Sequence, residues 1–407
     1  MSLSTDRSYK MKLRDVENAF KYRRIPYPKR SVELIALLAI SCTFFLFMHT
    51  NKLNSRLKEM EVKLQPSEFS ALGLTGNHIS GHDAGKHDDI NTLHGTYQYL
   101  KSTGQLQRLS ADRLNNTKNA EVEVLFFNRA AKVGSEAMLE LFIALVDFND
   151  DLELERSGLR EPTVRQMNKQ AQREAAELVA GLDEGTFYIR HINWLDFSEF
   201  DLPLPIYINM VRDPVERVIS WFYYARSSYK NAIEYRKSPN KRIKPESWYK
   251  KNFNECVRSG DPECQYVPHT VKDFIPNFKR QSLFYCGHHD DCLPFNSPTA
   301  VQMAKEHVER DYAVVGSWED TNITLTVLER YIPRFFRGAK LMYEMHTNKI
   351  TNRNKNKRKP YIEPEVKEMI RRNFTHEYEF YHFCKQRLYK QYLALNLHEL
   401  EKHGLLN

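Results

Sequence analysis

The sequence predicts an α/β fold with a central parallel sheet, in one folded domain that covers residues 119–407. Three short apolar runs, at 122–127, 206–211 and 313–315, are typical of strands buried on both faces. Stretches with apolar residues at helical spacing separate these runs. This alternation favours a layered arrangement of helices on a parallel sheet.

The composition is that of a globular protein with a basic balance. The chain has 407 residues, of which 41% are hydrophobic and 28% are charged. This length is enough for one large domain or two ordinary ones. The net charge of +8 is compatible with an acidic partner, which is a nucleic acid, an anionic membrane or a polyanionic glycan. The charge balance alone does not choose among these partners.

An apolar run near the N-terminus predicts a membrane anchor. Residues 34–48 carry no charge, and the extended segment 31–50 contains Glu33 as its only ionised group, which is just long enough to span a bilayer. Lysines and arginines in 21–30 precede it and predict a cytosolic N-terminus. The segments are thus a cytosolic tail (1–30), a signal anchor (31–50) and a lumenal remainder, as in a single-pass type II membrane protein. A buried core helix is the alternative.

The segment 51–118 is predicted to be a stem or linker. Its first part has a short heptad-like stripe between residues 53 and 64. Its later part is rich in Gly, His, Asp, Asn and Ser, with few bulky apolar residues. His78, His82, His87 and His94 fall in this part and are compatible with a metal-binding tract, but the polar composition favours a disordered stem. The short anchor suits the thin membranes of the early secretory pathway.

The cysteines and sequons agree with a lumenal domain. Cys256 with Cys264 and Cys286 with Cys292 are two close pairs, each able to close a small loop in an oxidising compartment. Cys384 is left over among aromatic residues and is expected to be buried. A zinc site is the rival interpretation, although there is no CxxC motif. Glycosylation sequons occur at Asn115, Asn322 and Asn373.

The stretch VEVLFFNRAAKVGSEAMLELF (122–142) predicts a strand, a turn and a helix. A helix start offers free N–H groups that suit an anion, and Lys132 in the turn is placed to neutralise a phosphate or sulfate. The P-loop signature is absent, because Gly134 and Ser135 follow the lysine. The alternative is a lysine in a solvated surface turn.

The stretch 206–229 places an arginine at the end of a second buried strand. Asp213 is predicted to cap the following helix, so Arg212 lies in the usual ligand crevice of a parallel sheet. Ser220 lies two turns further on, and an arginine fork with a hydroxyl can bind a phosphate. The alternatives are an ion pair of Arg212 with Glu216 and a serine without a role.

The third stretch is FYIRHINWLDF (187–197), in which His191 follows a short predicted strand. Apolar and aromatic residues flank this histidine. It is either a buried structural residue or, if it lines a cleft, a base that removes a proton from a hydroxyl.

Together these stretches resemble a known family. The blocks NRxxK, RDPxERxxS, HxxxLDF and VVGSWED…PRFFRGA are similar to blocks of the glycan uronyl 2-O-sulfotransferases, including heparan sulfate 2-O-sulfotransferase. These are Golgi type II enzymes of heparan and dermatan sulfate synthesis. The resemblance extends from about Val122 to Cys384, which is nearly all of the predicted lumenal domain.

The resemblance implies a P-loop-kinase-like sulfotransferase fold that binds the donor 3′-phosphoadenosine 5′-phosphosulfate (PAPS). Lys132 matches the family lysine that touches the oxygen joining phosphate to sulfate. Arg129, Gly134 and Ser135 belong to the same 5′-phosphosulfate loop. The two cysteine pairs fall where the family has its short disulfide loops.

The remaining roles follow from the same resemblance. Arg212 and Ser220 match the pair that binds the donor's 3′-phosphate, and His191 matches the catalytic base. The implied reaction moves a sulfuryl group to a hydroxyl, the 2-O of a uronic acid, on a glycosaminoglycan or a glycoprotein glycan. It requires no metal and no nucleic acid, and the related enzymes suggest a homotrimer in the Golgi membrane.

Three departures leave the acceptor open. Ile189 replaces a second histidine of the heparan sulfate enzymes, and Val133 and Glu136 replace a threonine or arginine near the loop. A negative Glu136 is unfavourable beside a donor phosphate unless it points away. The stretch 229–248 is expected to border the acceptor cleft and is basic, but it is not closely similar to the family.

Three rival functions remain. A Golgi glycosyltransferase shares the topology, but the sequence has no Asp-x-Asp metal motif. A nucleotide kinase shares the fold, but its P-loop order is absent. A catalytically silent polyanion-binding protein would use the basic run 349–359, which has six basic residues and is predicted to be a mobile loop.

Overall fold

The computed structural model describes most of the chain beyond residue 89. The described residues are 90–159, 166–238, 240, 242–271, 279–346 and 359–402. The predicted tail, anchor and heptad-like stripe, and nearly all of the basic run 349–359, lie outside them. No helix among the described residues has the length and apolar character needed to cross a membrane.

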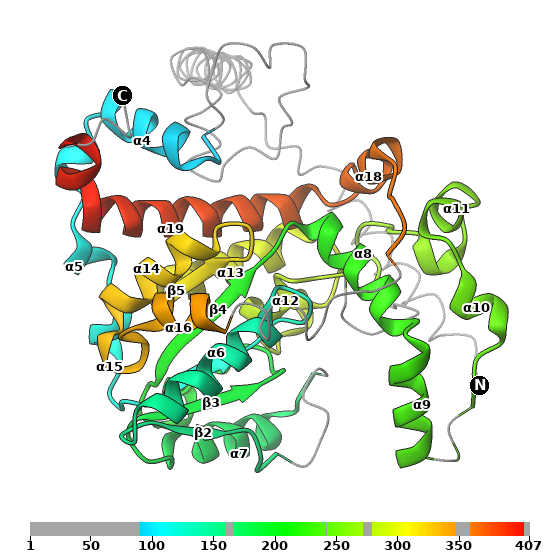
Figure 1. Cartoon of the computed structure of the whole chain (residues 1–407), viewed down its shortest axis with the longest axis horizontal. Helices are drawn as coiled ribbons and strands as arrows, with labels where there is room; N and C mark the ends of the chain where they lie inside the picture. Colours follow the sequence, from blue (N-terminus) through cyan, green and yellow to red (C-terminus); the bar gives the residue numbers. More distant parts are fainter. Residues whose placement is uncertain are drawn as a thin grey trace, which may run out of the picture. The chain divides into compact units, whose positions relative to one another are not determined.

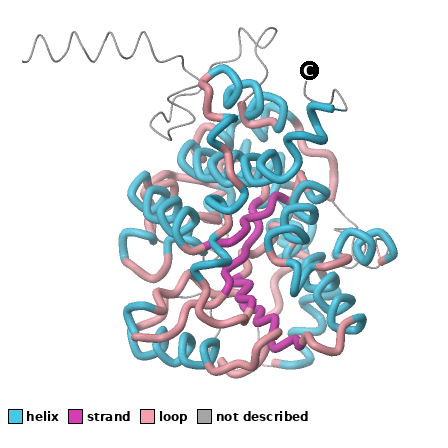
Figure 2. Tube along the Cα trace, turned by 90° about the vertical axis from the view of Figure 1, so that its left-hand side faces the viewer, coloured by secondary structure: helices cyan, strands magenta, loops and turns pink. Residues whose placement is uncertain are grey.

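The core is a five-stranded parallel sheet, which confirms the predicted α/β class. The strands follow the spatial order β2-β3-β1-β4-β5, and helices lie on both sides of them (Figures 1 and 2). Their bounds are β1 Leu125–Asn128, β2 Glu153–Glu155, β3 Thr186–Arg190, β4 Ile206–Val211 and β5 Tyr312–Ser317.

Helices connect and flank these strands. The α-helices of the first half are α4 Leu93–Ser102, α5 Ala111–Leu114, α6 Ser135–Phe148, α7 Lys169–Ala180, α8 Pro214–Ala225, α9 Ser228–Lys237, α10 Glu246–Lys250 and α11 Phe253–Arg258. Those of the second half are α12 Leu283–Cys286, α13 Pro298–Arg310, α14 Thr321–Tyr331, α15 Pro333–Phe336, α16 Ala339–Met345, α18 Pro364–Arg371 and α19 Thr375–Lys402. Short 3-10 turns lie at Leu106–Arg108 (η1), Asn116–Asn119 (η2), Ser198–Phe200 (η3), Pro262–Cys264 (η4) and Asp290–Cys292 (η5).

The predicted strand at 122–127 begins later than expected, at Leu125. The N–H groups of Glu121 and Val122 both donate to the carbonyl of Leu204, in the loop before β4, so these residues lie outside the regular ladder. From Leu125 onward, β1 pairs with β3 on one side and β4 on the other. The apolar run is therefore buried, but only its second half is a strand.

An aromatic core fixes α6 to the sheet. The ring of Phe142 on α6 stacks on Phe187 of β3 with centroids 4.6 Å apart, and Phe336 of α15 packs edge-on against both rings. Such pairs add about 0.5–1.5 kcal/mol beyond the burial of their surface. The loop that joins β1 to α6 is consequently anchored at both ends.

The predicted linker is wrong for residues 90–118, which are folded. Tyr97 and Leu100 of α4 form a buried cluster with Leu393 of α19. Asn116 donates to the carbonyls of Glu309 and Tyr312, at 2.7 and 3.0 Å. The composition does not reveal this folded segment, because only a few apolar residues are needed to pack it against the long helix α19. The folded region thus begins before residue 119.

Both expected disulfides are present. Cys256–Cys264 joins α11 to η4, and Cys286–Cys292 joins α12 to η5. All four cysteines are used in these bonds, so the zinc interpretation is wrong, and Cys384 is free and buried as predicted. Of the sequon asparagines, Asn322 is exposed, whereas Asn115 and Asn373 are half-buried.

Candidate active site

The candidate site lies at the edge of the sheet where three neighbouring strands end. His191 follows β3, Arg129 follows β1 and Arg212 follows β4, with β1 between the other two strands. Lys132 lies in the loop between β1 and α6. Arg212 Nη1 donates to the Lys132 carbonyl over 3.3 Å, and Arg129 Nε donates to His191 Nε2 over 3.1 Å. The structure therefore brings these four predicted site residues together.

Buried hydrogen bonds fix the end of β1, from which the loop starts. Asn209 Nδ2 donates to the Asn128 carbonyl over 2.7 Å, and the hydroxyl of Tyr312 donates to Asn128 Oδ1 over 2.9 Å. The Ala130 N–H donates to Asn209 Oδ1. Fully satisfied buried networks of this kind favour a single backbone geometry. The loop is thus positioned by β4 and β5 as well as by β1.

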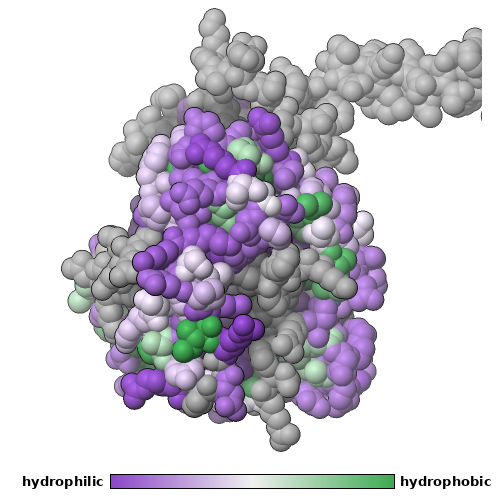
Figure 3. Space-filling model, turned by 90° about the vertical axis from the view of Figure 1, so that its right-hand side faces the viewer, coloured by the Kyte–Doolittle hydropathy of each residue, from purple (hydrophilic) through white to green (hydrophobic). Residues whose placement is uncertain are grey.

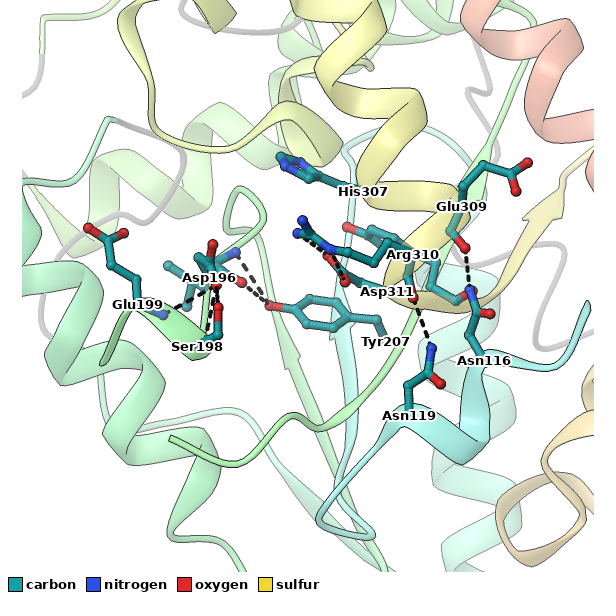
Figure 4. Close-up of polar contacts among 12 residues, drawn as sticks. Asn116, Asn119, Asp196, Ser198, Glu199, Tyr207, His307, Glu309, Arg310 and Asp311 are labelled. Atoms are coloured by element: carbon teal, nitrogen blue, oxygen red, sulfur yellow. Dashed lines mark hydrogen bonds and ion pairs between the residues drawn. The ribbon is translucent and has the colours of Figure 1, made fainter. Parts of the chain in front are cut away.

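A second set of contacts fixes the segment after His191. The Tyr207 hydroxyl on β4 donates to the Leu195 carbonyl over 2.9 Å and accepts from the Leu195 N–H over 3.3 Å. Asp196 accepts from the backbone and hydroxyl of Ser198, as Figure 4 shows. The LDF part of the HxxxLDF block therefore has a structural role, because its hydrogen bonds fix the segment that follows His191.

The loop after β1 presents N–H groups to an anion. Lys132 and Gly134 both adopt left-handed backbone conformations, with φ of 66° and 89°. Gly134 is the N-cap residue of α6 and provides no side chain to cap the first turn. Free N–H groups at the start of a helix, with the positive end of its dipole, favour an anion there. This loop is therefore suited to an anion, and its binding of a phosphosulfate stays a prediction.

We expect Gly134→Ala to destabilise the protein by about 2–5 kcal/mol, because a methyl group meets both strain and collision. Its Cβ would lie 2.0 Å from Cε3 of Trp318, and its φ is in the left-handed region. Gly338→Ala is the matched control, since Gly338 also has a left-handed φ but no atom within 4 Å of its added Cβ. Equal losses in the two variants, measured by denaturant unfolding, would contradict the collision.

Lys132 is half-buried and is not a solvated surface lysine. Its Nζ lies 3.9 Å from the ring centroid of Tyr224 on α8. Within the described part of the chain it forms no ion pair with a carboxylate. Burial and the neighbouring Arg212 and Lys230 lower the pKa of Lys132 to about 8. An unpaired ammonium in such surroundings favours an incoming anion.

His191 is a neutral base whose acceptor nitrogen is covered. Its Nδ1 donates to the carbonyl of Arg129 over 2.9 Å, which leaves Nε2 as the acceptor nitrogen. The guanidinium of Arg129 donates to Nε2 from Nε at 3.1 Å and from Nη2 at 2.9 Å. Burial and this guanidinium lower the pKa of His191 to about 3. Nε2 can therefore accept a proton only after Arg129 has moved.

Glu136 faces Arg129 rather than the start of α6. Its carboxylate accepts from Nη2 of Arg129 and forms an ion pair with it. The negative charge that is unfavourable beside a phosphate is thereby compensated within the site. Glu136 and His191 compete for the same guanidinium, so an anion bound to Arg129 competes with both.

The predicted ion pair of Arg212 with Glu216 is weak. Arg212 Nη2 lies 4.0 Å from Glu216 Oε2, whereas Lys359 and Lys367 approach the same carboxylate at 2.8 and 2.7 Å. The capping prediction is confirmed, because Asp213 accepts from the Glu216 N–H over 2.9 Å. Arg212 thus remains available for a ligand. Ser220 is buried two turns further along α8.

Three buried N–H donors at the site have no hydrogen-bond partner among the described residues. They are Arg129 Nη1, Arg212 Nε and Gln281 Nε2. Buried donors are nearly always paired in folded proteins, so such a group of orphans indicates a missing acceptor. All three are N–H donors, and two belong to guanidinium groups. The chemistry of this set fits a phosphate or sulfate.

Several residues of the site had no individual signal in the sequence. Gln281 accepts from the Arg212 N–H over 3.2 Å, Tyr224 lies under Lys132, and Lys230 lies on the same ring. Trp318 packs against Gly134 and belongs to the VVGSWED block. Of these four residues, Trp318 is the one that the family blocks point to. The other three are recognisable only from the folded chain.

The described residues contain no group of three or more His, Cys, Asp or Glu side chains arranged to hold a metal ion.

Comparison with known proteins identifies relatives of this chain. The sequence model of the sulfotransferase family matches residues 115–384. The blocks quoted from the sequence also resemble one member of the uronyl group, Pipe. The uronyl 2-sulfotransferase homolog pip of Drosophila melanogaster is 46% identical, over 97% of this chain and 95% of that protein.

Two further relatives match a smaller part. Human uronyl 2-sulfotransferase is 27% identical, over 67% of this chain and 64% of that protein. Chicken heparan sulfate 2-O-sulfotransferase 1 is 32% identical, over 54% of this chain and 57% of that protein. The matched part is thus less than two thirds of each of these two relatives.

Proposed function

Because the chain belongs to the sulfotransferase family, we propose that it transfers the sulfuryl group of PAPS to a glycan hydroxyl. The acceptor proposed is the 2-O position of a uronic acid in a glycosaminoglycan or a glycoprotein glycan. One observation supports this most strongly: among the described residues, buried guanidinium and amide N–H groups without an acceptor and a lysine without a carboxylate lie at the same sheet edge as a neutral histidine.

In this proposal the donor is held at two places. Arg212 and Ser220 bind its 3′-phosphate, and the N–H groups of Gly134 and Ser135 face its phosphosulfate. Lys132 stabilises charge that develops on the leaving phosphate oxygen, since sulfuryl transfer, like phosphoryl transfer, depends mainly on alignment and charge stabilisation. Bound PAPS supplies the sulfuryl group itself.

His191 is proposed as the base that takes the proton of the acceptor hydroxyl at Nε2. Its Nδ1 hydrogen bond to the Arg129 carbonyl orients the ring for this role. Arg129 has to leave Nε2 first, and an anion that draws the guanidinium away does this. The withdrawal also removes the neighbouring cation that depresses the pKa of His191, so the base becomes stronger when the site is filled.

The proposal of a uronyl acceptor rests on the relatives and on the hydrophilic character of one face of the molecule. The names of the matched proteins include uronyl and heparan sulfate 2-O-sulfotransferases. The face that carries α9–α11 is mostly hydrophilic where it is described, and its hydrophobic side chains lie in separate small groups (Figure 3). The position of the family's second histidine is Ile189, which is buried in β3, so His191 acts without it.

We also propose a location in the Golgi membrane with the catalytic domain in the lumen. The support is the anchor-like segment 31–50 together with two disulfides, which persist in oxidising compartments. A homotrimer is proposed by analogy with related enzymes only.

The function is tested by sulfate transfer from radiolabelled PAPS, with protein that begins at Phe69 so that α4 is retained. Desulfated heparan, dermatan, chondroitin and glycoprotein acceptors are compared, with Lys132→Ala and His191→Ala as controls. Label on one acceptor, lost in both variants, supports the proposal. Donor binding without transfer points to another acceptor. No donor binding by folded protein contradicts the proposal and favours a polyanion-binding protein.

A further inference from the structure

Two ammonium groups share the ring of Tyr224. Lys132 Nζ lies 3.9 Å from its centroid, and Lys230 Nζ, from the first turn of α9, lies 3.6 Å from it. The two cations are therefore separated by no more than the sum of these distances. Two like charges this close repel each other, and the face of the ring stabilises both ammonium groups.

The other charged groups around Lys132 come from each element packed against it. Arg212, after β4, and Arg129, in the loop after β1, add positive charge, and Glu136 on α6 adds one negative charge. Lys230 itself has Glu234 at 3.7 Å, one turn along α9. The balance at Lys132 is therefore strongly positive, with Arg212 and Lys230 as its main cationic neighbours.

We propose that Lys230 is a positioning residue that makes Lys132 a stronger hydrogen-bond donor to the leaving oxygen. The inference rests on the proposed function, because it assigns Lys230 to the leaving-group side of that reaction. Tyr224 keeps both ammonium groups in place, and the repulsion between them directs the Lys132 N–H groups toward the anion. A cation that gives up its proton more readily forms a stronger charge-assisted hydrogen bond.

This arrangement has a cost at high pH. Lys132 stabilises the leaving group only when protonated, and its pKa of about 8 means that the protonated form is lost as the pH rises through 8. Removing the charge of Lys230 raises the pKa of Lys132. We therefore expect a lysine-to-methionine change at position 230 to extend activity toward alkaline pH, although it removes a cation from an anion site.

The first measurement is kcat/KM for PAPS against pH, which reports the protonation state of the enzyme before PAPS binds, for Lys230→Met and Lys230→Arg. A shift of the alkaline limb by about one pH unit raises the ratio of kcat/KM at pH 9 to kcat/KM at pH 7 about fivefold in Lys230→Met. The arginine variant keeps the charge and is expected to retain the original limb. Lys250→Met is the matched control, because Lys250 is an exposed lysine on α10 that pairs with Glu246.

The second measurement needs no activity. The full chain is labelled with trace acetic anhydride at a series of pH values, and peptide mass spectrometry follows the reaction at Lys132. The expected midpoint is near pH 8 in the original protein and higher in Lys230→Met only. An unchanged midpoint in Lys230→Met, or an equal shift in Lys250→Met, overturns the inference. If the midpoints are as expected but no sulfate is transferred, the proposed function is contradicted, while the effect of Lys230 on Lys132 stands.

Discussion

His191→Ala is expected to reduce sulfate transfer by about 10²- to 10⁴-fold, the usual contribution of a general base. Binding of the desulfated product, adenosine 3′,5′-bisphosphate, is expected to be retained or slightly strengthened. His191 has no part in the predicted phosphate contacts, and its removal takes away a competitor for the Arg129 guanidinium. Calorimetry with the bisphosphate and initial rates with PAPS separate the two effects.

The histidine control is His289→Ala, which removes an exposed imidazole from the loop closed by Cys286 and Cys292. It should retain normal turnover. Normal turnover in His191→Ala would remove this residue from the mechanism. A loss of bisphosphate binding equal to the loss of rate would instead show that the imidazole mainly positions Arg129.

The same histidine has a pH signature. A pKa near 3 in the ligand-free protein means that His191 stays neutral from pH 7 down to about pH 4. An NMR titration of its ring without ligand should therefore show no protonation between pH 5 and pH 7. In the presence of the bisphosphate the titration is expected to move upward, because the anion draws the Arg129 guanidinium from Nε2.

The sequence was sufficient for the parts of the fold and site that depend on local pattern. Asp213 caps α8 because its side chain reaches an N–H three residues away, and the apolar spacing after Ser135 marks α6. The strand ends that carry Arg129, His191 and Arg212 follow from a parallel sheet, in which carboxyl ends meet at one edge. The cap and the helix need only neighbours in the chain, and the position of the strand ends needs only the parallel order of the strands.

The remaining features depend on contacts between distant segments. Nothing near His191 in the sequence shows that Arg129, 62 positions away, covers its Nε2. The fold of α4 depends on Leu393, and the tuning of Lys132 depends on Lys230 reaching Tyr224 from another helix. The sequence makes Glu136 unfavourable beside a donor phosphate, because it does not show that the Glu136 carboxylate pairs with Arg129. In each case the deciding interaction is tertiary.

Arg212→Met is expected to weaken binding of adenosine 3′,5′-bisphosphate by about 10- to 100-fold, since a hydrogen bond to a charged group contributes about 1.5–3 kcal/mol. The guanidinium has few competing partners within the described residues. Its Nε is buried without a hydrogen bond, its Nη1 reaches the Lys132 carbonyl, and Glu216 lies 4.0 Å away. Isothermal calorimetry measures the loss directly.

Kinetics should distinguish binding from chemistry in this variant. If Arg212 binds only the 3′-phosphate, it contributes equally to ground state and transition state, so KM for PAPS rises while kcat is largely kept. Arg212→Lys retains the charge but not the planar fork, and an intermediate loss would show that both matter. Arg258→Met removes an exposed arginine paired with Glu363 and should bind the bisphosphate normally. Unchanged binding in Arg212→Met would place the 3′-phosphate elsewhere, while a fall in kcat alone would show that Arg212 acts through the Lys132 backbone it touches.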